Sequence, residues 1–417
     1  MKIAIIGGGA AGIGAAWNLQ NRAEVTIFEA GNSLGGHVDT HSLLVGGRTC
    51  SFDSAFTVFN PNTYPEFTRW LSERGVATQQ AEASFSVRNL DTALEFGSRG
   101  LTGLFSQRRN VVNWRFLEML TQLRALRRIS HEEIDPTLTL GELIEQQGFG
   151  DALIDNYLRP LCATIWSLSS ARIHELPAVH VLRFMSGYQL LGANQGQWRV
   201  ISGGSQRYLE AFSDQFAGTV RCAAKVLGVR RLAHGVVVKL ASGPEHFDAL
   251  VLACHSDQAL QLLEDATGSE REILGAIRFT DNRVVVHSDP AVMPRDRRAW
   301  CSWNALIDGN CQVSGSCQVS YWMNRLQSLN ADQQFFVTLN PTMQLRQVWS
   351  ELNYRHPQFS AQARQAQARR SEISGAMNTY FCGAYWGWGS HEDAFVSGMQ
   401  AAAAVRQQGQ MRREASA

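Results

Sequence analysis

The sequence predicts a protein of the α/β class, and three observations lead to this prediction. A glycine-rich turn near the N-terminus lies between a β-strand pattern at residues 2–6 and a helix pattern at residues 10–21. Short β-strand patterns dominate residues 220–253, whereas residues 107–128 and 138–165 have helical periodicity. Together these features predict a Rossmann-like parallel sheet and a second domain of the α+β type.

The composition is typical of a globular protein. A chain of 417 residues is long enough for two domains, and 45% hydrophobic residues can form a sizeable core. Eleven tryptophans indicate a large apolar pocket or thick contacts between domains. The net charge of +1 gives no reason to expect a nucleic-acid partner. The oligomeric state is left open.

Cysteine content and hydropathy indicate in which cellular compartment the protein is expected. The eight cysteines form no CxxC pair and have no zinc spacing, so we expect reduced thiols and no metal site. No run of about 18 apolar residues is present, so we expect no membrane span. These observations predict a cytoplasmic protein, with peripheral contact to a membrane as an open alternative.

The first strand and turn resemble a dinucleotide-binding unit. Residues 2–6 are rich in isoleucine, as expected for a buried parallel strand. The turn that follows fits the G-x-G-x-x-G pattern at Gly7, Gly9 and Gly12. These glycines permit the tight turn, the approach of a pyrophosphate and the packing of helix on strand. Ala10 and Ala11 then open the helix, whose N–H groups can hold phosphate.

A second strand supplies the carboxylate that such a unit needs. Residues 24–28 have a strand pattern and are followed by Glu29 and Ala30, with Glu29 standing 17 residues after Gly12. A carboxylate at this place accepts hydrogen bonds from an adenosine ribose. A glycine-rich turn without a ligand is the alternative, and the surrounding strands and helix argue against it.

Paired glycines separate two classes of dinucleotide. Gly35 and Gly36 follow the second strand after a short gap, and His37 comes next. A glycine pair here opens the backbone toward the pyrophosphate or the flavin side of a long dinucleotide. An NAD enzyme has no need of it, so the pattern favours FAD.

The segment from Glu29 to Gly36 resembles the second dinucleotide signature of the flavin-containing amine oxidase superfamily. That superfamily includes amine oxidases, protoporphyrinogen oxidase and phytoene desaturases. Further segments resemble, in order, the motifs of one branch: FAD-binding proteins found beside, or fused to, cyclopropane-fatty-acid synthases. These segments are residues 53–67, 157–168, 198–209, 252–260, 323–327, 336–341 and 380–395. The resemblance covers nearly the whole chain.

The resemblance implies an FAD-binding domain of the GR2 type interleaved with an α+β substrate-binding domain. The FAD-binding domain would comprise residues 1–80, 191–260 and 371–410. The substrate-binding domain would comprise residues 81–190 and 261–370. Covalent flavin in amine oxidases uses a cysteine upstream of the last glycine-rich strand, whereas Cys382 matches the strand itself. We therefore expect noncovalent FAD.

The resemblance also implies the cofactor contacts. The segment from Asp53 to Thr57 would run under the flavin ring, and Val226 would lie at the adenine. Residues 379–382 would form the last strand of the nucleotide sheet. A helix that begins at Asp393 would direct its N–H groups at the flavin. The expected contacts are Gly7, Gly9, Ala10, Ala11, Gly12, Glu29, Ala30, Gly35, Gly36, His37, Phe56, Thr57, Val226, Gly383, Asp393, Ala394 and Phe395.

The substrate side rests on fewer signals. His391 and Glu392 are the candidate catalytic residues because they stand at the start of the flavin helix, although a structural histidine is the commoner case. Candidate pocket residues are Trp166, Trp198, Trp386, Trp388 and Ser390. Ser390 and Ala394 stand where the family usually has an aromatic residue and a glycine. The missing aromatic residue counts against oxidation of primary amines.

The chain has no Ser-His-Asp order, HExxH motif or Walker loop, so hydrolysis and phosphoryl transfer are not expected. We expect an FAD-dependent oxidoreductase that removes hydride from a hydrophobic, acyl-type substrate by desaturation or dehydrogenation. The alternatives are oxidation of a C–N bond in an amine and redox-neutral isomerisation of a double bond. A structural role for FAD in a partner of a lipid-modifying enzyme also stays open.

Residues 107–128 suggest how a partner could bind. This segment has apolar residues at helical spacing, six arginines and a single acid, Glu118. A basic amphipathic helix can lie on an anionic membrane surface or bind an acidic acyl carrier. An ordinary helix with a solvated basic face is the alternative.

Overall fold

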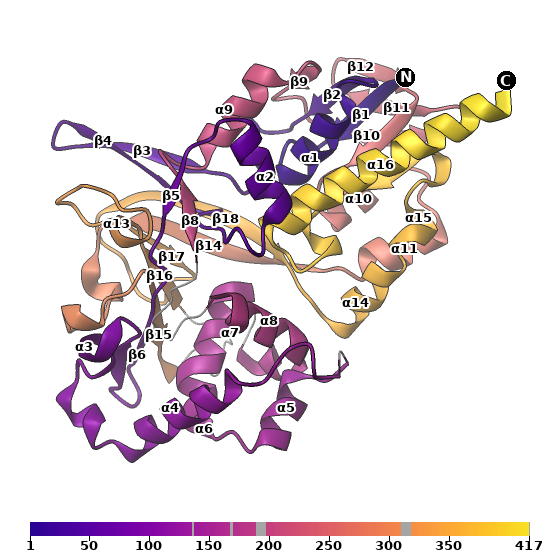
Figure 1. The fold of residues 1–417 in the computed structure, drawn as a ribbon. Helices are drawn as coiled ribbons and strands as arrows, with labels where there is room; N and C mark the ends of the chain where they lie inside the picture. Colours follow the sequence, from indigo (N-terminus) through magenta and orange to yellow (C-terminus); the bar gives the residue numbers. More distant parts are fainter. Residues whose placement is uncertain (136, 167–169, 189–196, 310–317, 417) are drawn as a thin grey trace.

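The structure is a computed structural model that describes residues 1–135, 137–166, 170–188, 197–309 and 318–416. A five-stranded parallel sheet lies at the end of the molecule that carries both termini (Figure 1). Its strand order is β19 (Thr379–Phe381), β13 (Ala249–Leu252), β1 (Lys2–Ile6), β2 (Glu24–Phe28) and β9 (Thr219–Arg221). The strands expected at residues 2–6 and 24–28 are confirmed.

Alternate residues of β1 enter two separate cores, as the period of a strand requires. Ile3 and Ile5 pack with helices α1 (Ala10–Leu19) and α16 (His391–Ser416). Ala4 and Ile6 belong to the core on the other face. That face is covered by β10 (Gly228–Arg231), β11 (Val236–Leu240), β12 (Gly243–Phe247), α10 (Ser256–Leu262), α11 (Gly268–Gly275), α14 (Ala361–Ala368) and α15 (Arg370–Ile373).

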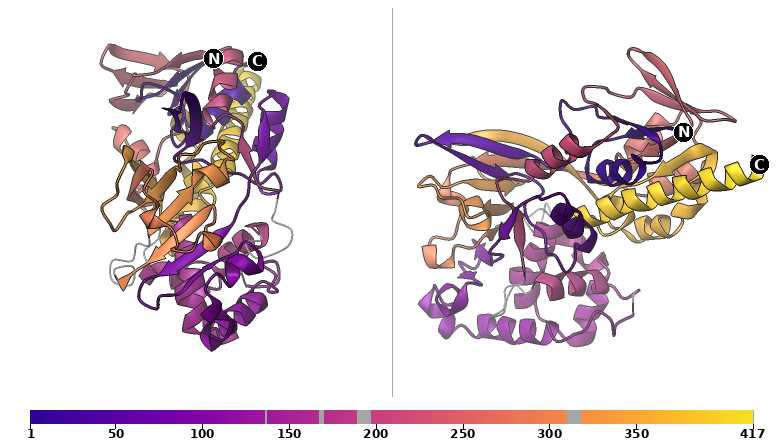
Figure 2. Two further views of the ribbon diagram at one scale, coloured as in Figure 1. Left: turned by 90° about the vertical axis from the view of Figure 1, so that its left-hand side faces the viewer. Right: turned by 45° about the horizontal axis from the view of Figure 1, so that its top comes forward.

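A seven-stranded mixed sheet forms the second part of the molecule. Its order is β18 (Val348–Pro357), β14 (Phe279–His287), β17 (Phe336–Leu339), β16 (Gln318–Trp322), β15 (Trp303–Ile307), β6 (Phe85–Asn89) and β7 (Glu95–Gly97). Its largest core includes residues of α4 (Trp114–Leu126), α5 (Leu140–Gln147), α6 (Asp151–Leu153), α7 (Arg159–Trp166) and α8 (Ala178–Tyr188). Figures 1 and 2 show these helices at the end of the molecule opposite the termini.

Short elements connect the two sheets. β5 (Thr78–Gln80) pairs with β8 (Arg199–Ile201), and β3 (Thr40–Val45) pairs with β4 (Arg48–Asp53). The remaining helices are α2 (Pro65–Glu73), α3 (Gly100–Leu104), α9 (Gln206–Gln215) and α13 (Met323–Leu326). Each sheet draws strands from distant parts of the chain. The exact division into two interleaved domains stays a proposal.

Helix boundaries differ from the sequence expectations. The helix expected over residues 107–128 is a 3₁₀ turn, Arg108–Val111, followed by α4. Asn113 separates them because its side chain accepts the Phe116 N–H and so caps α4. The stretch 138–165 is broken after α5 by Gly148, which has a φ of 64°. The last helix begins at His391 rather than at Asp393.

Two glycines let α1 and α16 pack backbone against backbone. A Cβ atom at Gly398 of α16 would lie 2.0 Å from the carbonyl oxygen of Ala11. A Cβ atom at Gly14 of α1 would lie 2.4 Å from the carbonyl oxygen of Phe395. Any larger residue at either position would separate the two helices, which lie side by side in Figure 1.

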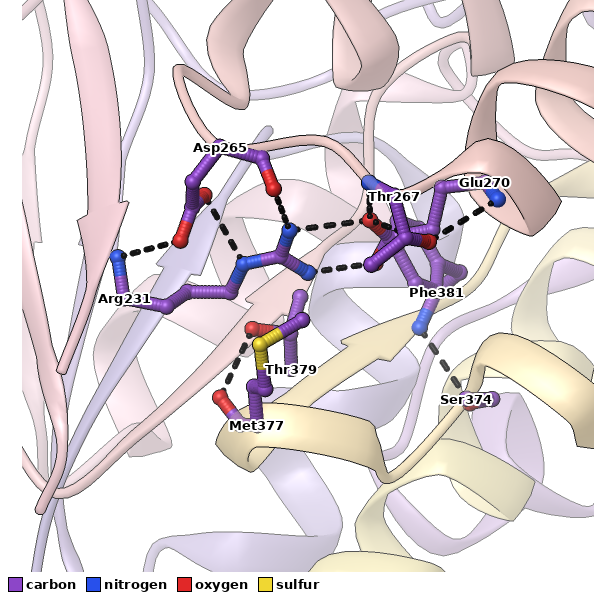
Figure 3. A network of polar contacts seen from close by, with 8 residues as sticks. All are labelled: Arg231, Asp265, Thr267, Glu270, Ser374, Met377, Thr379 and Phe381. Atoms are coloured by element: carbon purple, nitrogen blue, oxygen red, sulfur yellow. Dashed lines mark hydrogen bonds and ion pairs between the residues drawn. The ribbon is translucent and has the colours of Figure 1, made fainter. Parts of the chain in front are cut away.

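A buried ion pair joins the three-stranded sheet to α11 (Figure 3). Arg231 of β10 donates to the Glu270 carboxylate, and its Nε lies 3.0 Å from Asp265. The side chains of Arg231 and Glu270 are both almost completely buried. Burial opposes ionisation of Glu270, but hydrogen bonds from Arg231 and Thr267 hold the pKa of its carboxyl below the usual value.

We predict that breaking this pair destabilises the fold. Glu270→Ala leaves the guanidinium buried with fewer partners, and such a loss lowers the free energy of unfolding by about 3–5 kcal/mol. Urea denaturation followed by circular dichroism measures the change. The double variant Arg231→Met/Glu270→Leu should lose less than Glu270→Ala alone. An equal or larger loss in the double variant would contradict the assignment.

Candidate cofactor and active site

The first glycine loop forms an open cradle before α1. Gly7 has a φ of 108°, and a Cβ atom at Gly12 would lie 1.9 Å from the carbonyl oxygen of Gly7. The N-cap residue Gly9 provides no side-chain hydrogen bond to the helix. The first N–H groups of α1 therefore lack a side-chain cap while Ala10 and Ala11 are buried. This arrangement fits a pyrophosphate.

The second glycine loop lies directly against the first. The Gly35 N–H donates to the Gly8 carbonyl at 3.0 Å, and Gly35 forms a bridge with Gly9. Gly36 has a φ of 59°, and a Cβ atom there would lie 3.4 Å from the Cα atom of Gly9. Tertiary structure thus brings together the two glycine motifs, which fits a dinucleotide whose phosphates contact both loops.

Glu29 stands where β2 ends, beside both loops. Its carboxylate accepts the N–H groups of Gly8 and Gly31, each at 2.8 Å. The side chain is half-buried and Ala30 beside it is exposed. Val226, expected at the adenine, is buried in the core that includes Phe28 and Ile6. Ribose binding by Glu29 and adenine contact by Val226 stay proposals that this placement supports.

The loop after β19 brings the C-terminal motif to the same region. The Gly383 N–H donates to Ser397 Oγ at 3.2 Å. A Cβ atom at Gly383 would lie 2.3 Å from the Tyr385 ring, so the close packing of this ring requires glycine. Residues 384–386 form a 3₁₀ turn before α16 begins.

Ser390 and Asp393 cap α16 reciprocally. Ser390 Oγ accepts the Asp393 N–H at 3.0 Å, and Asp393 Oδ2 accepts the Ser390 N–H at 2.9 Å. The same carboxylate oxygen accepts the Trp388 N–H at 3.0 Å. Both residues therefore shape the loop and the helix start. These contacts favour a structural role for Ser390 over direct contact with substrate.

His391 lies in an aromatic cluster. Its ring stacks on Phe56 with a centroid distance of 3.8 Å and an interplanar angle of 11°. Its Nε2 atom is 2.9 Å from the Tyr208 hydroxyl, and its ring meets Phe67 edge to face. Burial, with a smaller effect of His37, lowers the pKa of His391 to about 3. The imidazole is therefore neutral near pH 7.

Glu392 caps a different helix. Its two carboxylate oxygens accept the N–H groups of Glu66 and Phe67, each at 2.9 Å. Both N–H groups lie in the first turn of α2, where they have no acceptor within the helix. The N-cap residue of α2 provides no side-chain hydrogen bond either. Burial raises the pKa of the Glu392 carboxyl. The geometry makes Glu392 a positioning residue for α2 more readily than a proton carrier.

The Asp53 carboxylate accepts several hydrogen bonds, although Asp53 was not among the predicted site residues. Its buried carboxylate accepts hydrogen bonds from Thr40, from the Ser205 N–H and hydroxyl, and from Gln327 at 2.6 Å. Gln327 Nε2 also lies 3.4 Å from the Thr57 carbonyl oxygen. Asp53 opens one of the motifs noted in the sequence, so its position was a usable signal. Its partners lie up to 274 residues away and could not be identified from the sequence.

Three histidines from separate segments meet beside the second glycine loop. The ring of His37 lies 6.0 Å from His255 and 5.4 Å from His356, measured between centroids. Tyr354 is also 5.4 Å from His37, and its hydroxyl donates to Asp39 at 2.7 Å. Within the described residues, no group of three or more His, Cys, Asp or Glu side chains is placed to hold a metal ion.

The tryptophans divide into two groups. Trp198 is fully buried in the large core and lies 6.0 Å from Trp303, which favours packing over substrate contact. Trp386 and Trp388 are half-buried in the loop before α16. The Trp388 ring lies 3.7 Å from His180 of α8, a residue that our sequence reasoning missed. The side chain of Trp166 lies outside the described residues.

The buried histidines predict that the free energy of unfolding falls at acid pH. Burial lowers the pKa to about 3 for His180, His356 and His391, and to about 4 for His255 and His287. The unfolded chain titrates near pH 6.5, so between about pH 6.5 and 4 it binds more protons than the folded protein. The free energy of unfolding should therefore fall as pH falls through this window and change little from these groups above it.

Urea midpoints from about pH 8 to about pH 4.5 measure this dependence. His255→Gln should flatten the slope below pH 6.5, while removal of the exposed His234 by His234→Gln should leave it unchanged. Equal slopes in the wild type and both variants would contradict the prediction.

Comparison with known proteins agrees with this geometry. The family model described as flavin containing amine oxidoreductase matches residues 10–286. No curated protein matches the chain at a significant level. None of the helices in the described ranges is long and apolar enough to cross a membrane.

Solved structures share the fold at low sequence identity. A CLA-producing fatty acid isomerase from P. acnes is 16% identical with a TM-score of 0.71, and the match covers 95% of this chain and 97% of the other. Putrescine oxidase bound to putrescine is 13% identical with a TM-score of 0.68, covering 98% and 99%. Cyclohexylamine oxidase from Brevibacterium oxydans IH-35A gives the same four values.

The match to the family model spans more than half of the chain and includes the first helix, the second glycine loop and the return strand β13. The two glycine loops and the uncapped start of α1 fit the cofactor of that family. The chain belongs to the flavin-containing amine oxidoreductase family and is an FAD-dependent oxidoreductase.

Proposed function

We propose that this enzyme removes hydride from a hydrophobic, acyl-type substrate, by desaturation or dehydrogenation. FAD supplies the hydride acceptor when it is bound. The chain's own residues bind the substrate, orient it and exclude water. We also propose that FAD is noncovalent, because Cys382 is fully buried and burial raises the pKa of its thiol to about 12.

The observation that carries the choice of substrate is the charge around the two loop tryptophans. The Arg364 guanidinium lies over the Trp388 ring at 5.4 Å, and the Arg370 guanidinium lies over Trp386 at 5.5 Å. A protonated amine would meet like charges beside both rings. An acyl substrate with an anionic or neutral end meets no such repulsion.

His391 is the proposed catalytic residue. It is neutral near pH 7, it stands at the start of α16, and its hydrogen bond to Tyr208 fixes the ring. A neutral imidazole in this place can orient a substrate without adding charge. Glu392, one residue later, holds α2 in place and thereby the Phe67 ring that packs on His391.

Two alternatives have specific support. Isomerisation of a double bond is favoured by the structural similarity to a fatty acid isomerase, although that similarity establishes the fold alone. Oxidation of a C–N bond is the chemistry suggested by the names of the two oxidases with the same fold. We also keep as a proposal the placement in the branch associated with cyclopropane-fatty-acid synthases.

Anaerobic mixing of the yellow holoenzyme with candidate substrates tests the proposed reaction. Unsaturated fatty acids or saturated acyl chains should bleach the flavin, and a primary amine should not. His391→Ala should retain FAD and slow the bleaching at least about tenfold, since a lost positioning contact misaligns the reacting atoms. The conservative variant His391→Gln should recover part of the rate.

Other results would redirect the assignment. Product formation without net bleaching or an added acceptor would establish isomerisation. Bleaching by amines with release of an aldehyde would establish amine oxidation. Loss of FAD in His391→Ala would show that the histidine is structural.

We propose in addition that the segment 107–128 contacts an anionic partner, either a membrane surface or an acyl carrier. Val112, which precedes α4, is 82% exposed, and Trp114, the first residue of α4, is 67% exposed. Arg124, Arg127 and Arg128 line a cavity of about 410 Å³ together with Leu120 and Leu123. Exposed apolar residues beside arginines are typical of a surface that binds amphiphilic anions. Such contact would suit a cytoplasmic enzyme, and the six described cysteines are free, as in a reducing compartment.

Charge reversal tests this surface. The triple variant Arg124→Glu/Arg127→Glu/Arg128→Glu should bind anionic vesicles, or an acidic carrier protein, at least about tenfold more weakly at low salt. Co-sedimentation measures the first and titration calorimetry the second. A matched triple reversal at the exposed Arg22, Arg230 and Arg271 should have little effect. If both triple variants bind the anionic partner with equal affinity, α4 has only a structural role.

A further inference from the structure

Helix α14 holds the loop that precedes the flavin helix. Gln367 Nε2 donates to the carbonyl oxygens of Tyr385 and Gly387, both at 2.7 Å. One turn earlier on the same helix, Arg364 lies beside Trp388. The helix thus fixes the loop backbone with one side chain and covers its tryptophan with another.

The Trp388 ring is held between two parts of the molecule. The backbone N–H of Trp388 donates to Asp393 Oδ2, which fixes the loop to the start of α16. One neighbour is the Arg364 guanidinium, and another is the His180 ring at 3.7 Å, in edge-to-face geometry. His180 belongs to α8, and its ring also lies 5.9 Å from Phe359. Arg364 is therefore at the junction of α14, the flavin loop and α8.

The guanidinium of Arg364 has an unused donor at this junction. Its Nη1 atom is buried and has no hydrogen-bond partner among the described residues. No ion pair within the described ranges involves this side chain, whereas Arg369 on the adjoining turn pairs with both Glu272 and Glu372. A buried donor of a charged group that lacks an acceptor is costly and calls for an explanation. Arginine does not avoid this cost by losing its proton.

The surroundings indicate which kind of acceptor is missing. After burial, the charges of Arg364 and Arg183 are the main causes that lower the pKa of His180 to about 3. Two guanidinium groups therefore act on this junction, and the Asp393 carboxylate at the loop already accepts hydrogen bonds from Trp388 and Ser390. The Trp388 and Phe359 rings that contact His180 are apolar. A ligand that suits it has a negative oxygen group attached to an apolar chain.

We infer that Arg364 is the residue that binds the carboxylate of the acyl substrate, with Trp388 and His180 beside the chain that follows it. This inference rests on the proposed function and adds the substrate class, a free long-chain carboxylic acid. A guanidinium and a carboxylate form strong charge-assisted hydrogen bonds in a fixed geometry. An acyl thioester has no such charge, so the subsite distinguishes free acids from carrier-linked chains. Of the two partners proposed for residues 107–128, this subsite therefore favours the membrane surface over an acyl carrier.

The test measures binding to the holoenzyme and requires no turnover. Oleate, oleyl alcohol and oleylamine have the same chain and differ in the head group. Each is titrated while the visible spectrum of the bound flavin is followed. Wild-type protein should bind oleate at least about tenfold more tightly than the alcohol, and the amine most weakly. Arg364→Met should abolish the preference for oleate, and Arg364→Lys should keep part of it.

Two controls separate this inference from its alternatives. Arg230→Met removes an exposed arginine elsewhere and should leave all three affinities unchanged. An unaltered flavin spectrum and thermal midpoint in Arg364→Met exclude a folding defect. If Arg364→Met is unstable, the titration of Arg364→Lys decides whether Arg364 binds the carboxylate. Equal binding of oleate and alcohol by the wild type, or an undiminished preference in Arg364→Met, would overturn the inference. Selective oleate binding without any flavin reduction would refute the proposed reaction and leave the subsite standing.

Discussion

The contact between α1 and α16 is the constraint on which the site depends. Gly14 and Gly398 allow the two helix backbones to touch, with no space for a Cβ atom at either position. The start of α1 carries the first glycine loop, and the start of α16 carries His391 and its neighbours. A helix pair that packs at this distance sets the separation of the two ends. The proposed phosphate and flavin regions are therefore positioned by one interface, formed by residues 384 positions apart.

Two buried carboxylates and one half-buried carboxylate maintain the geometry around that interface. Asp53 joins β4 to the start of α9 and to Gln327, Glu392 caps α2, and Asp393 holds the loop at Trp388. Each accepts hydrogen bonds from backbone N–H groups that would otherwise lack partners. Acidic residues near the proposed flavin site are candidates for proton carriers. In this protein their hydrogen bonds show that they first determine where helices begin.

The charge beside the two loop tryptophans is the basis of our proposal that the substrate is an acyl chain rather than an amine. Aromatic rings can bind ammonium groups when their faces are open, but the rings of Trp386 and Trp388 already have guanidinium groups over them. The same family of folds includes proteins named for amine and for fatty acid chemistry. The fold is therefore shared by proteins with either kind of substrate, and the local charge at the loop before α16 is what favours an acyl substrate over an amine in our proposal.

Sequence by itself determined the elements with strong local signals. Strands β1 and β2, the glycine turn and the class of cofactor followed from periodicity and from the unique backbone freedom of glycine. Helix boundaries were less accurate, because a capping residue such as Asn113 or a left-handed glycine such as Gly148 ends a pattern that periodicity alone would continue. Only the tertiary structure assigned Glu392 its hydrogen bonds to α2, assembled the three histidines around His37, and placed Arg364 beside Trp388. These contacts join segments up to several hundred residues apart, and side-chain contacts at such separations leave no periodic signal in a single sequence.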